Sequence, residues 1–321
     1  MLDSSAGDSE NILRIDCHTH LFPKRYLKEL DRLNIPFGQT LNERFTTTPE
    51  RIGDMEKAGI DRQVISIAVP GVNMSTPENA VHLSKLVNDE TAKVTEQDER
   101  FIGLASLPML SPMEAVDELR RAVEDLGLKG AALFTNVSGK QIDIPEFWPV
   151  YRMASRLGVP VFVHPIAPLH REVYDDYSLL SVLGFPFETT IAATRLTLSG
   201  LLEELPDLKL VLSHLGGTLP YLVGRIDDGH RIFKSTQNKI KHPPSKYLKK
   251  MYLDTASFYE PALACALDFW GADKLVLGSD YPYGWVGELK RCVESVENLG
   301  LEADELDKIL NGNAEELFKL R

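Results

Sequence analysis

Short apolar runs alternate with longer helical patterns along most of this chain. Eight of the runs have the length of a strand and are rich in Val, Ile, Leu or Phe, which is typical of strands buried on both faces. The eight runs are residues 12–16, 63–69, 101–107, 130–134, 160–164, 208–213, 251–254 and 274–279.

Helical patterns fill the segments between these runs. Thr76 and Ser111 each precede a proline, which predicts a capped helix start with proline in the first turn. A glycine or proline follows the apolar pattern at most of the other ends, and such residues stop helices. The predicted helices cover residues 76–96, 111–126, 145–157, 188–205 and 259–270.

Eight strands alternating with helices predict a parallel α/β sheet, and the number eight favours a closed (β/α)8 TIM barrel. An open doubly wound sheet is the alternative. Residues 1–11 are polar and we expect them to be flexible, whereas residues 12–321 form a single barrel domain. Residues 21–49 form a long proline-containing insertion after the first strand, which we interpret as a lid over the barrel mouth.

Composition and charge narrow the class of function. The chain has 321 residues and a formal net charge of −12, so it lacks the cationic surplus that binds nucleic acid or anionic membranes. No secretory signal and no membrane span are recognisable. Cys17, Cys265 and Cys292 are too few and too scattered for a disulfide framework. We therefore expect a reduced, cytoplasmic protein.

Five polar side chains follow the predicted strands at their carboxyl ends. His18 and His20 come after the first strand, and their i, i+2 spacing in an extended segment turns both imidazoles to one side. His164 ends the fifth strand, His214 follows the sixth and Asp280 follows the eighth. These strand ends meet at the mouth of a barrel, where its active sites are built.

Histidine nitrogens with one carboxylate form a donor set that suits Zn²⁺ and tolerates Mn²⁺, Fe²⁺ or Co²⁺. A bound ion lowers the pKa of its water towards about 7. His214 need not be a ligand, because beside such a water it can act as general acid or base. The alternative is that these histidines are structural, and their shared position at strand ends argues against it.

Taken together, the motifs resemble the amidohydrolase superfamily, in its amidohydrolase 2 branch, and within that branch the metal-dependent decarboxylases. The opening IDCHTH and the later strand-end motifs occur in the family's order over nearly the whole chain. The matching segments are residues 15–20, 49–55, 162–165, 184–190, 213–217, 220–226, 277–282 and 312–314.

The resemblance implies a role for each of these residues. His18, His20, His164 and Asp280 would hold one divalent metal, with zinc preferred and manganese as the alternative. His214 would activate the water on the metal, and Asp280 would also take part in catalysis.

Two arginines are implied to bind substrate. Arg51 falls where the family holds a substrate carboxylate, and a guanidinium matches a carboxylate with two parallel hydrogen bonds. Arg225 falls where an arginine of a partner subunit enters the active site, which implies a homodimer. Sequence position alone adds two further expectations. Trp285, just past Asp280, is expected to line the pocket and bind substrate, with simple packing as the alternative, and Asp254 at the end of the seventh strand is expected to support a ligand histidine.

The resemblance also limits the claim about substrate. Ile166 stands where close relatives have tryptophan, and the segment around Asn136 differs from theirs, although we expect both positions to line the pocket. The sequence therefore predicts nonoxidative decarboxylation of a small, anionic, unsaturated or aromatic carboxylic acid, with the exact acid open. A metal-dependent hydrolase of an amide, lactone or carbon–carbon bond, a hydratase of an oxo-acid, and a binding protein without catalysis are the alternatives.

Overall fold

The computed structural model of the chain describes residues 12–37, 41–168, 170–283 and 289–320. Its parallel strands follow the predicted runs closely, since Val, Ile and Leu on both faces of a strand are buried between the barrel interior and the surrounding helices. The strands are β1 (Ile15–His20), β2 (Arg62–Ser66), β3 (Phe101–Gly103), β4 (Ala105–Ser106), β5 (Ala131–Phe134), β8 (Val161–His164), β9 (Leu210–Leu212), β10 (Tyr252–Asp254) and β11 (Leu275–Val276), with a small antiparallel pair, β6 (Asn136–Val137) and β7 (Lys140–Gln141).

The strands form one circular hydrogen-bonded order. β1, β2 and β3 pair in sequence, and β4, β5, β8, β9, β10 and β11 do the same. The predicted third strand joins the two groups, because Leu104 N donates to Ile65 O (3.0 Å) and Ala105 N donates to Gly130 O (2.9 Å). At the other end, Cys17 N donates to Leu277 O (2.7 Å). The chain after β11 therefore closes the barrel against β1.

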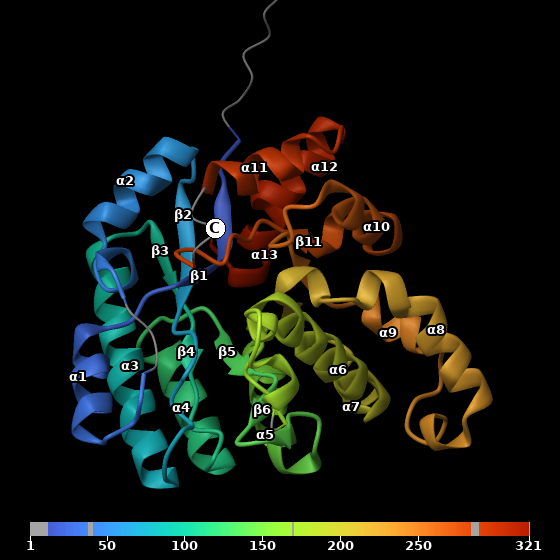
Figure 1. Cartoon of the computed structure of the whole chain (residues 1–321), viewed down its shortest axis with the longest axis horizontal. Coiled ribbons are helices and arrows are strands. Elements are labelled where there is room, and N and C mark those ends of the chain that lie inside the picture. Colours follow the sequence, from blue (N-terminus) through green and yellow to red (C-terminus); the bar gives the residue numbers. More distant parts are fainter. Residues whose placement is uncertain (1–11, 38–40, 169, 284–288, 321) are drawn as a thin grey trace, which may run out of the picture.

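Helices surround the strands, as Figure 1 shows. They are α1 (Lys24–Arg32), α2 (Pro49–Ala58), α3 (Pro77–Gln97), α4 (Pro112–Glu124), α5 (Trp148–Leu157), α6 (Phe185–Leu198), α7 (Leu201–Glu204), α8 (Leu219–Ile232), α9 (Pro244–Leu248), α10 (Glu260–Trp270), α11 (Leu289–Glu297), α12 (Ala303–Asp307) and α13 (Asn313–Phe318).

Local capping chemistry explains where several helices begin and end. The Thr76 side chain accepts a hydrogen bond from Asn79 N (3.3 Å), as expected of the predicted N-cap. The single helix predicted over residues 188–205 is wrong, because α6 ends at Leu198 and α7 begins at Leu201. Gly200 separates them with φ of 88°, and a Cβ there would lie 2.9 Å from the Lys239 carbonyl oxygen.

The barrel interior is filled by apolar side chains from many strands. Ile15, Cys17, Val64, Phe162 and Val211 belong to one buried cluster, so Cys17 is a core residue. Side chains of α13 join the same cluster, so this helix closes the end of the barrel opposite the strand carboxyl ends. The open end is left for polar side chains.

The predicted insertion at residues 21–49 contains α1 and a helical turn at Glu43–Phe45. Phe22, Tyr26, Leu30 and Phe45 are buried in a cluster that includes Leu83 of α3. The insertion is therefore anchored on the outer helices rather than detached from them. Within the described ranges, no helix is both long and apolar enough to cross a membrane.

Candidate metal centre and cavity

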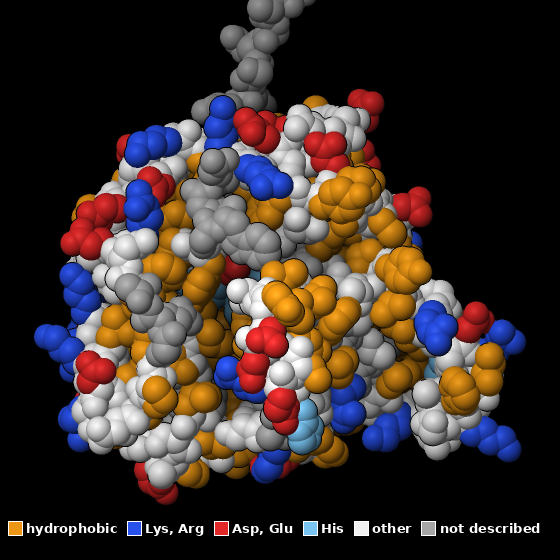
Figure 2. Space-filling model, in the orientation of Figure 1, with side chains coloured by type: hydrophobic (Ala, Val, Ile, Leu, Met, Phe, Trp, Pro, Cys, Tyr) orange, Lys and Arg blue, Asp and Glu red, His pale blue; other side chains and the backbone are white. Residues whose placement is uncertain are grey.

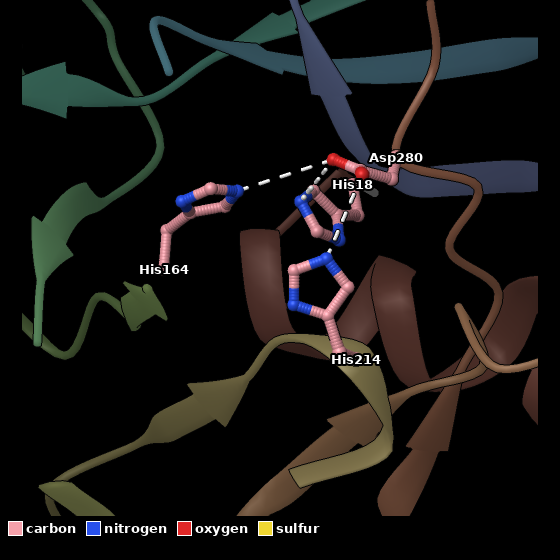
Figure 3. A group of neighbouring side chains, drawn as sticks. All are labelled: His18, His164, His214 and Asp280. Carbon is pink, nitrogen blue, oxygen red and sulfur yellow. Dashed lines mark ion pairs between the residues drawn. The ribbon is translucent and has the colours of Figure 1, made fainter. Parts of the chain in front are cut away.

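The five predicted polar side chains meet at the carboxyl ends of the strands. His18 and His20 lie in β1, His164 ends β8, and His214 and Asp280 follow β9 and β11. The register between β1 and β2 shifts between Asp16 and Thr19, which is where the first histidine leaves the regular ladder. In Figure 3 the side chains of His18, His164, His214 and Asp280 point toward one another.

Asp280 is the centre of this cluster. Its Oδ1 lies 3.0 Å from His20 Nε2, 3.2 Å from His18 Nε2 and 3.9 Å from His164 Nε2. Its other oxygen, Oδ2, lies 3.6 Å from His214 Nε2. One carboxylate thus faces three imidazoles with one oxygen and the fourth imidazole with the other.

In His18, His20 and His164 the outer ring nitrogen contacts a protein group, which turns the inner one toward the centre, whereas His214 Nδ1 is buried without a hydrogen-bond partner. His18 Nδ1 donates to Asp254 Oδ2 (2.6 Å), and His164 Nδ1 donates to the Pro165 carbonyl oxygen (2.8 Å). His20 Nδ1 lies 3.4 Å from Ser66 Oγ. These contacts direct each of the three Nε2 atoms toward the centre, where a bound ion could take the place of a proton. Asp254 therefore lies where the sequence placed it, against a candidate ligand histidine.

The backbone is left-handed at two members of the cluster. His214 has φ of 53° and Asp280 has φ of 60°, a region that side chains other than glycine adopt at a cost. Asp280 N donates to His18 O (2.8 Å), and Leu215 N donates to Asp254 Oδ1 (3.1 Å). The closing strands therefore hold both residues in this conformation.

The charges and protonation states of the cluster favour binding of a cation. Burial lowers the pKa of His20 to about 3 and that of His164 to about 4, so both are neutral near pH 7. Burial works against a charge on His18, but Asp254 and Asp280 raise its pKa to about 10. Burial also works against ionised Asp280, yet the surrounding imidazoles hold its pKa well below the usual value. The two carboxylates thus favour positive charge at this point.

The donors fit a divalent ion. His18, His164, His214 and Asp280 each offer one ligand atom, and these atoms lie within 4.8 Å of one another. Ligand atoms held about 2.1 Å from one tetrahedral ion are about 3.4 Å apart, close to the separations around Asp280 Oδ1. His164 Nε2 is buried without a hydrogen-bond partner. A metal ligand role would satisfy that atom.

A cavity of about 810 Å³ opens above the cluster. His164, His214 and Asp280 line it, and Phe185 and Phe258 supply aromatic walls. Figure 2 shows a hollow in the centre of this face, with histidine and acidic atoms at its floor. Ile166 and Asn136 are not among the described lining residues, contrary to expectation. Asn136 instead donates to Ala167 O (3.2 Å) and to Glu188 Oε2 (3.3 Å).

Arg51 does not reach this cavity. It is 0% exposed, and its guanidinium donates to the His20 carbonyl oxygen and to Gln63 Oε1 (2.8 Å). It also stacks over the Tyr281 ring at 4.7 Å, and burial lowers its pKa to about 10. Its donors are thus directed to the backbone and side chains behind β1. In this structure Arg51 supports the strand that carries the histidines.

The other two predicted substrate residues lie elsewhere. Arg225 lies on α8 in a groove with Ile191 and Leu222, separate from the cavity that His164 and Asp280 line. It is exposed and has no ion pair with any residue that the structure describes. Trp285 lies outside the described residues.

Sequence reasoning missed two supporting groups. Asp16 is buried, and its carboxylate accepts hydrogen bonds from Ser279 Oγ (2.5 Å) and Ser279 N (3.0 Å), which fixes the residue before Asp280. Arg291 of α11 lines the cavity. The IDCHTH motif contained a signal for Asp16, whereas no motif marked Arg291.

Comparison with known proteins places this site in a family. The amidohydrolase family profile matches residues 15–320. The 2-amino-3-carboxymuconate-6-semialdehyde decarboxylase of Dictyostelium discoideum is 32% identical, and the match covers 96% of this chain and 92% of that protein.

Two solved structures share the fold. The 5-carboxyvanillate decarboxylase of Sphingomonas paucimobilis superposes with a TM-score of 0.88 at 25% identity, covering 96% of this chain and 99% of the other. A dihydroxybenzoic acid decarboxylase of Polaromonas, crystallised with manganese and the inhibitor 2-nitroresorcinol, superposes with a TM-score of 0.85 at 29% identity, covering 96% and 97%. The resemblance that the motifs suggested is confirmed, and the chain belongs to the amidohydrolase family.

Proposed function

We propose that this protein is a metal-dependent nonoxidative decarboxylase, a carbon–carbon lyase, of a small aromatic or unsaturated carboxylic acid. One observation carries the proposal above the others. A cluster of imidazoles and one carboxylate, which could bind a metal ion, forms the floor of a cavity with aromatic walls. The chain that contains it is related over its length to decarboxylases. An aromatic acid would bury its ring against Phe185 and Phe258 and place its polar end at the cluster.

One divalent ion would be held by His18, His20, His164 and Asp280. The Nε2 atoms of the three histidines surround Asp280 Oδ1, which supports this set of ligands. Zinc suits the donors best, and manganese is the alternative that the related Polaromonas structure favours. When bound, the ion supplies Lewis-acid stabilisation of negative charge on substrate oxygens.

His214 is the residue that we assign to proton transfer. Its side chain is 17% exposed, lines the cavity and lies 3.6 Å from Asp280 Oδ2, so a proton can pass between cavity and cluster. A proton reaches the carbon that carries the carboxylate. The bond from that carbon to the carboxyl group then breaks, carbon dioxide leaves, and the electron pair returns to the conjugated system. Phe185 and Phe258 would shield the reacting carbon from part of the solvent.

A homodimer is the second part of the proposal. α6 exposes Ile191 (46%) in the groove that holds Arg225, and α8 exposes Tyr221 (87%) on the same helix as that arginine. Exposed apolar side chains of this kind are typical of interfaces, and arginine is enriched in them. We propose that Arg225 enters the partner's cavity and binds the anionic substrate there. The unpaired cysteines Cys17, Cys265 and Cys292 support a reducing, cytoplasmic location.

Carbon dioxide release tests the activity. The metal-loaded protein is incubated with hydroxybenzoates and unsaturated dicarboxylates, and gas release is compared with hydrolysis of amides and lactones. Release of carbon dioxide from at least one acid supports the proposal, while hydrolysis alone refutes it in favour of an amidohydrolase-type hydrolase. His214→Ala should retain the metal but lose activity, whereas the exposed His242→Ala is the matched control and should keep both.

Subunit complementation tests the dimer. His214→Ala and Arg225→Ala proteins are each inactive if the roles above are right. Mixed and reassembled, they should regain activity, because one site of the heterodimer combines His214 with the partner's intact arginine. A monomer in sedimentation, or no recovery on mixing, would refute the shared site.

A further inference from the structure

Arg291 brings a positive charge to the cavity from an element that the metal cluster does not use. It lies in α11, which buries Leu289, Cys292 and Val293 against the barrel. Its neighbour Lys290 pairs with Glu294 one turn on (3.3 Å). Arg291 itself is an exposed residue that lines the cavity, and it makes no hydrogen bond or ion pair with any residue that the structure describes.

No acidic side chain among the described lining residues is free to pair with the charge of Arg291. Among the described lining residues Arg291 is the sole arginine or lysine, and Asp280 is the sole acid. Asp280 is committed to the imidazoles of the cluster, with oxygen to nitrogen separations of 3.0 and 3.2 Å to His20 and His18. An anion brought by a ligand would therefore be the partner of the guanidinium, which matches a carboxylate with two parallel hydrogen bonds.

The size of the cavity leaves room for such a group. Its volume of about 810 Å³ lies near the upper end of the range of roughly 300–1,000 Å³ that is usual for pockets that enclose drug-sized ligands. A single ring whose reacting carboxylate lies at the cluster would not fill it. A further substituent can therefore extend from the ring toward another wall.

We propose that Arg291 binds a second anionic group of the substrate, so that the substrate is an aromatic or unsaturated acid with one carboxylate to lose and another to keep. This inference rests on the proposed decarboxylase function, because it assigns the first carboxylate to the metal cluster. It makes Arg291 a specificity-determining residue, which discriminates between substrates rather than taking part in bond cleavage.

A pair of unreactive ligands tests the inference without turnover. In 4-hydroxy-3-nitrobenzoate a nitro group replaces the carboxylate that would be lost, and the remaining carboxylate is the proposed partner of Arg291. The ligand 2-nitrophenol is the same ring without that carboxylate. Binding of both to the manganese-loaded protein is measured by calorimetry, for wild type, Arg291→Gln and Lys290→Gln. Lys290→Gln removes the same charge from the same helix, outside the lining of the cavity.

We expect wild type and Lys290→Gln to bind the carboxylated ligand at least about tenfold more tightly than 2-nitrophenol, which is the effect of about 1.4 kcal/mol. Arg291→Gln should lower this preference below about threefold and leave 2-nitrophenol binding unchanged, since a charged hydrogen-bond pair contributes about 1.5–3 kcal/mol. Arg291→Lys should keep part of the preference.

The inference is refuted if wild type shows no preference, if it does not bind the carboxylated ligand, or if Arg291→Gln weakens both ligands equally. Equal weakening would mean that Arg291 binds the group at the metal cluster instead. Carbon dioxide release is scored separately. A protein that releases none but keeps the Arg291-dependent preference would refute the decarboxylase proposal and support the second anion site.

Discussion

Replacing Asp254 with asparagine should weaken metal binding while leaving the fold intact. Asp254 is fully buried, and one of its oxygens accepts hydrogen bonds from Leu215 N (3.1 Å) and Ala256 N (3.0 Å). Its other oxygen accepts the proton of His18 Nδ1 at 2.6 Å. Asparagine has the same shape, and the two backbone donors will fix its carbonyl oxygen on their side. Its NH₂ group must then face His18.

That orientation reverses the tautomer of His18. An NH₂ group opposite Nδ1 requires Nδ1 to accept, which moves the ring proton to Nε2 and removes the lone pair that would bind the ion. Loss of such a supporting carboxylate typically costs 10–100-fold in metal affinity. The expected weakening corresponds to about 1.4–2.8 kcal/mol at 1.4 kcal/mol per factor of ten.

Competition with a chromophoric chelator measures this change directly. Zinc and manganese dissociation constants are determined for wild type, Asp254→Asn and Asp268→Asn, the last being an exposed aspartate that makes the same charge change elsewhere. The unfolding temperature is recorded with and without metal. A dissociation constant within twofold of wild type, in a folded Asp254→Asn protein, would refute the argument that this carboxylate sets the tautomer.

Three further results are expected. Gly217→Ala should lower the free energy of unfolding by about 1–3 kcal/mol in chemical denaturation, because φ is 67° and a Cβ would lie 2.0 Å from a backbone oxygen of α6; an unchanged denaturation midpoint would contradict this. Arg51→Lys should lower the free energy of unfolding by about 1–3 kcal/mol by leaving buried acceptors unpaired, and should affect turnover of all carboxylates alike; a selective rise in KM would instead indicate substrate binding. The chelated protein should lose stability as the pH falls from about 6 to about 4.5, because the unfolded state protonates histidines whose folded pKa is about 3 (His20) and about 4 (His164). Burial raises the pKa of Asp16 to about 6, so the folded state binds one proton more at this carboxyl over the same pH range, which opposes the effect of the two histidines. The net difference of one proton corresponds to a loss of about 1.4 kcal/mol in the free energy of unfolding for each pH unit. An unfolding temperature that does not change over this pH range would contradict the prediction.

Much of the site could be predicted because its residues follow strands directly. Parallel barrel strands deliver their carboxyl ends to one mouth, so His18, His20, His164 and Asp280 were brought together by strand order alone. The same rule placed Asp254 beside them. For these residues, counting strands was equivalent to knowing the position in space.

Residues on helices and loops could not be placed in this way. Arg51 was predicted to bind substrate. In the structure, α2 places it behind β1, where its guanidinium donates a hydrogen bond to the His20 carbonyl oxygen. Arg291 carries no motif, and its position depends on how α11 packs back over the mouth. The break at Gly200 depends on the Lys239 carbonyl, which lies far away in sequence. Helix rotation and packing decide such contacts, and neither is encoded in local pattern.

The sequence by itself determined the barrel, the residues of the metal cluster and the family, because hydrophobic periodicity and strand order are local properties that a closed parallel sheet converts into position. Only the tertiary structure decided which nitrogen of each imidazole faces the centre, which arginine lines the cavity and which one supports β1. Those choices arise from hydrogen bonds between elements distant in sequence, such as His18 to Asp254 and Arg51 to His20, whose geometry exists only once the barrel has closed.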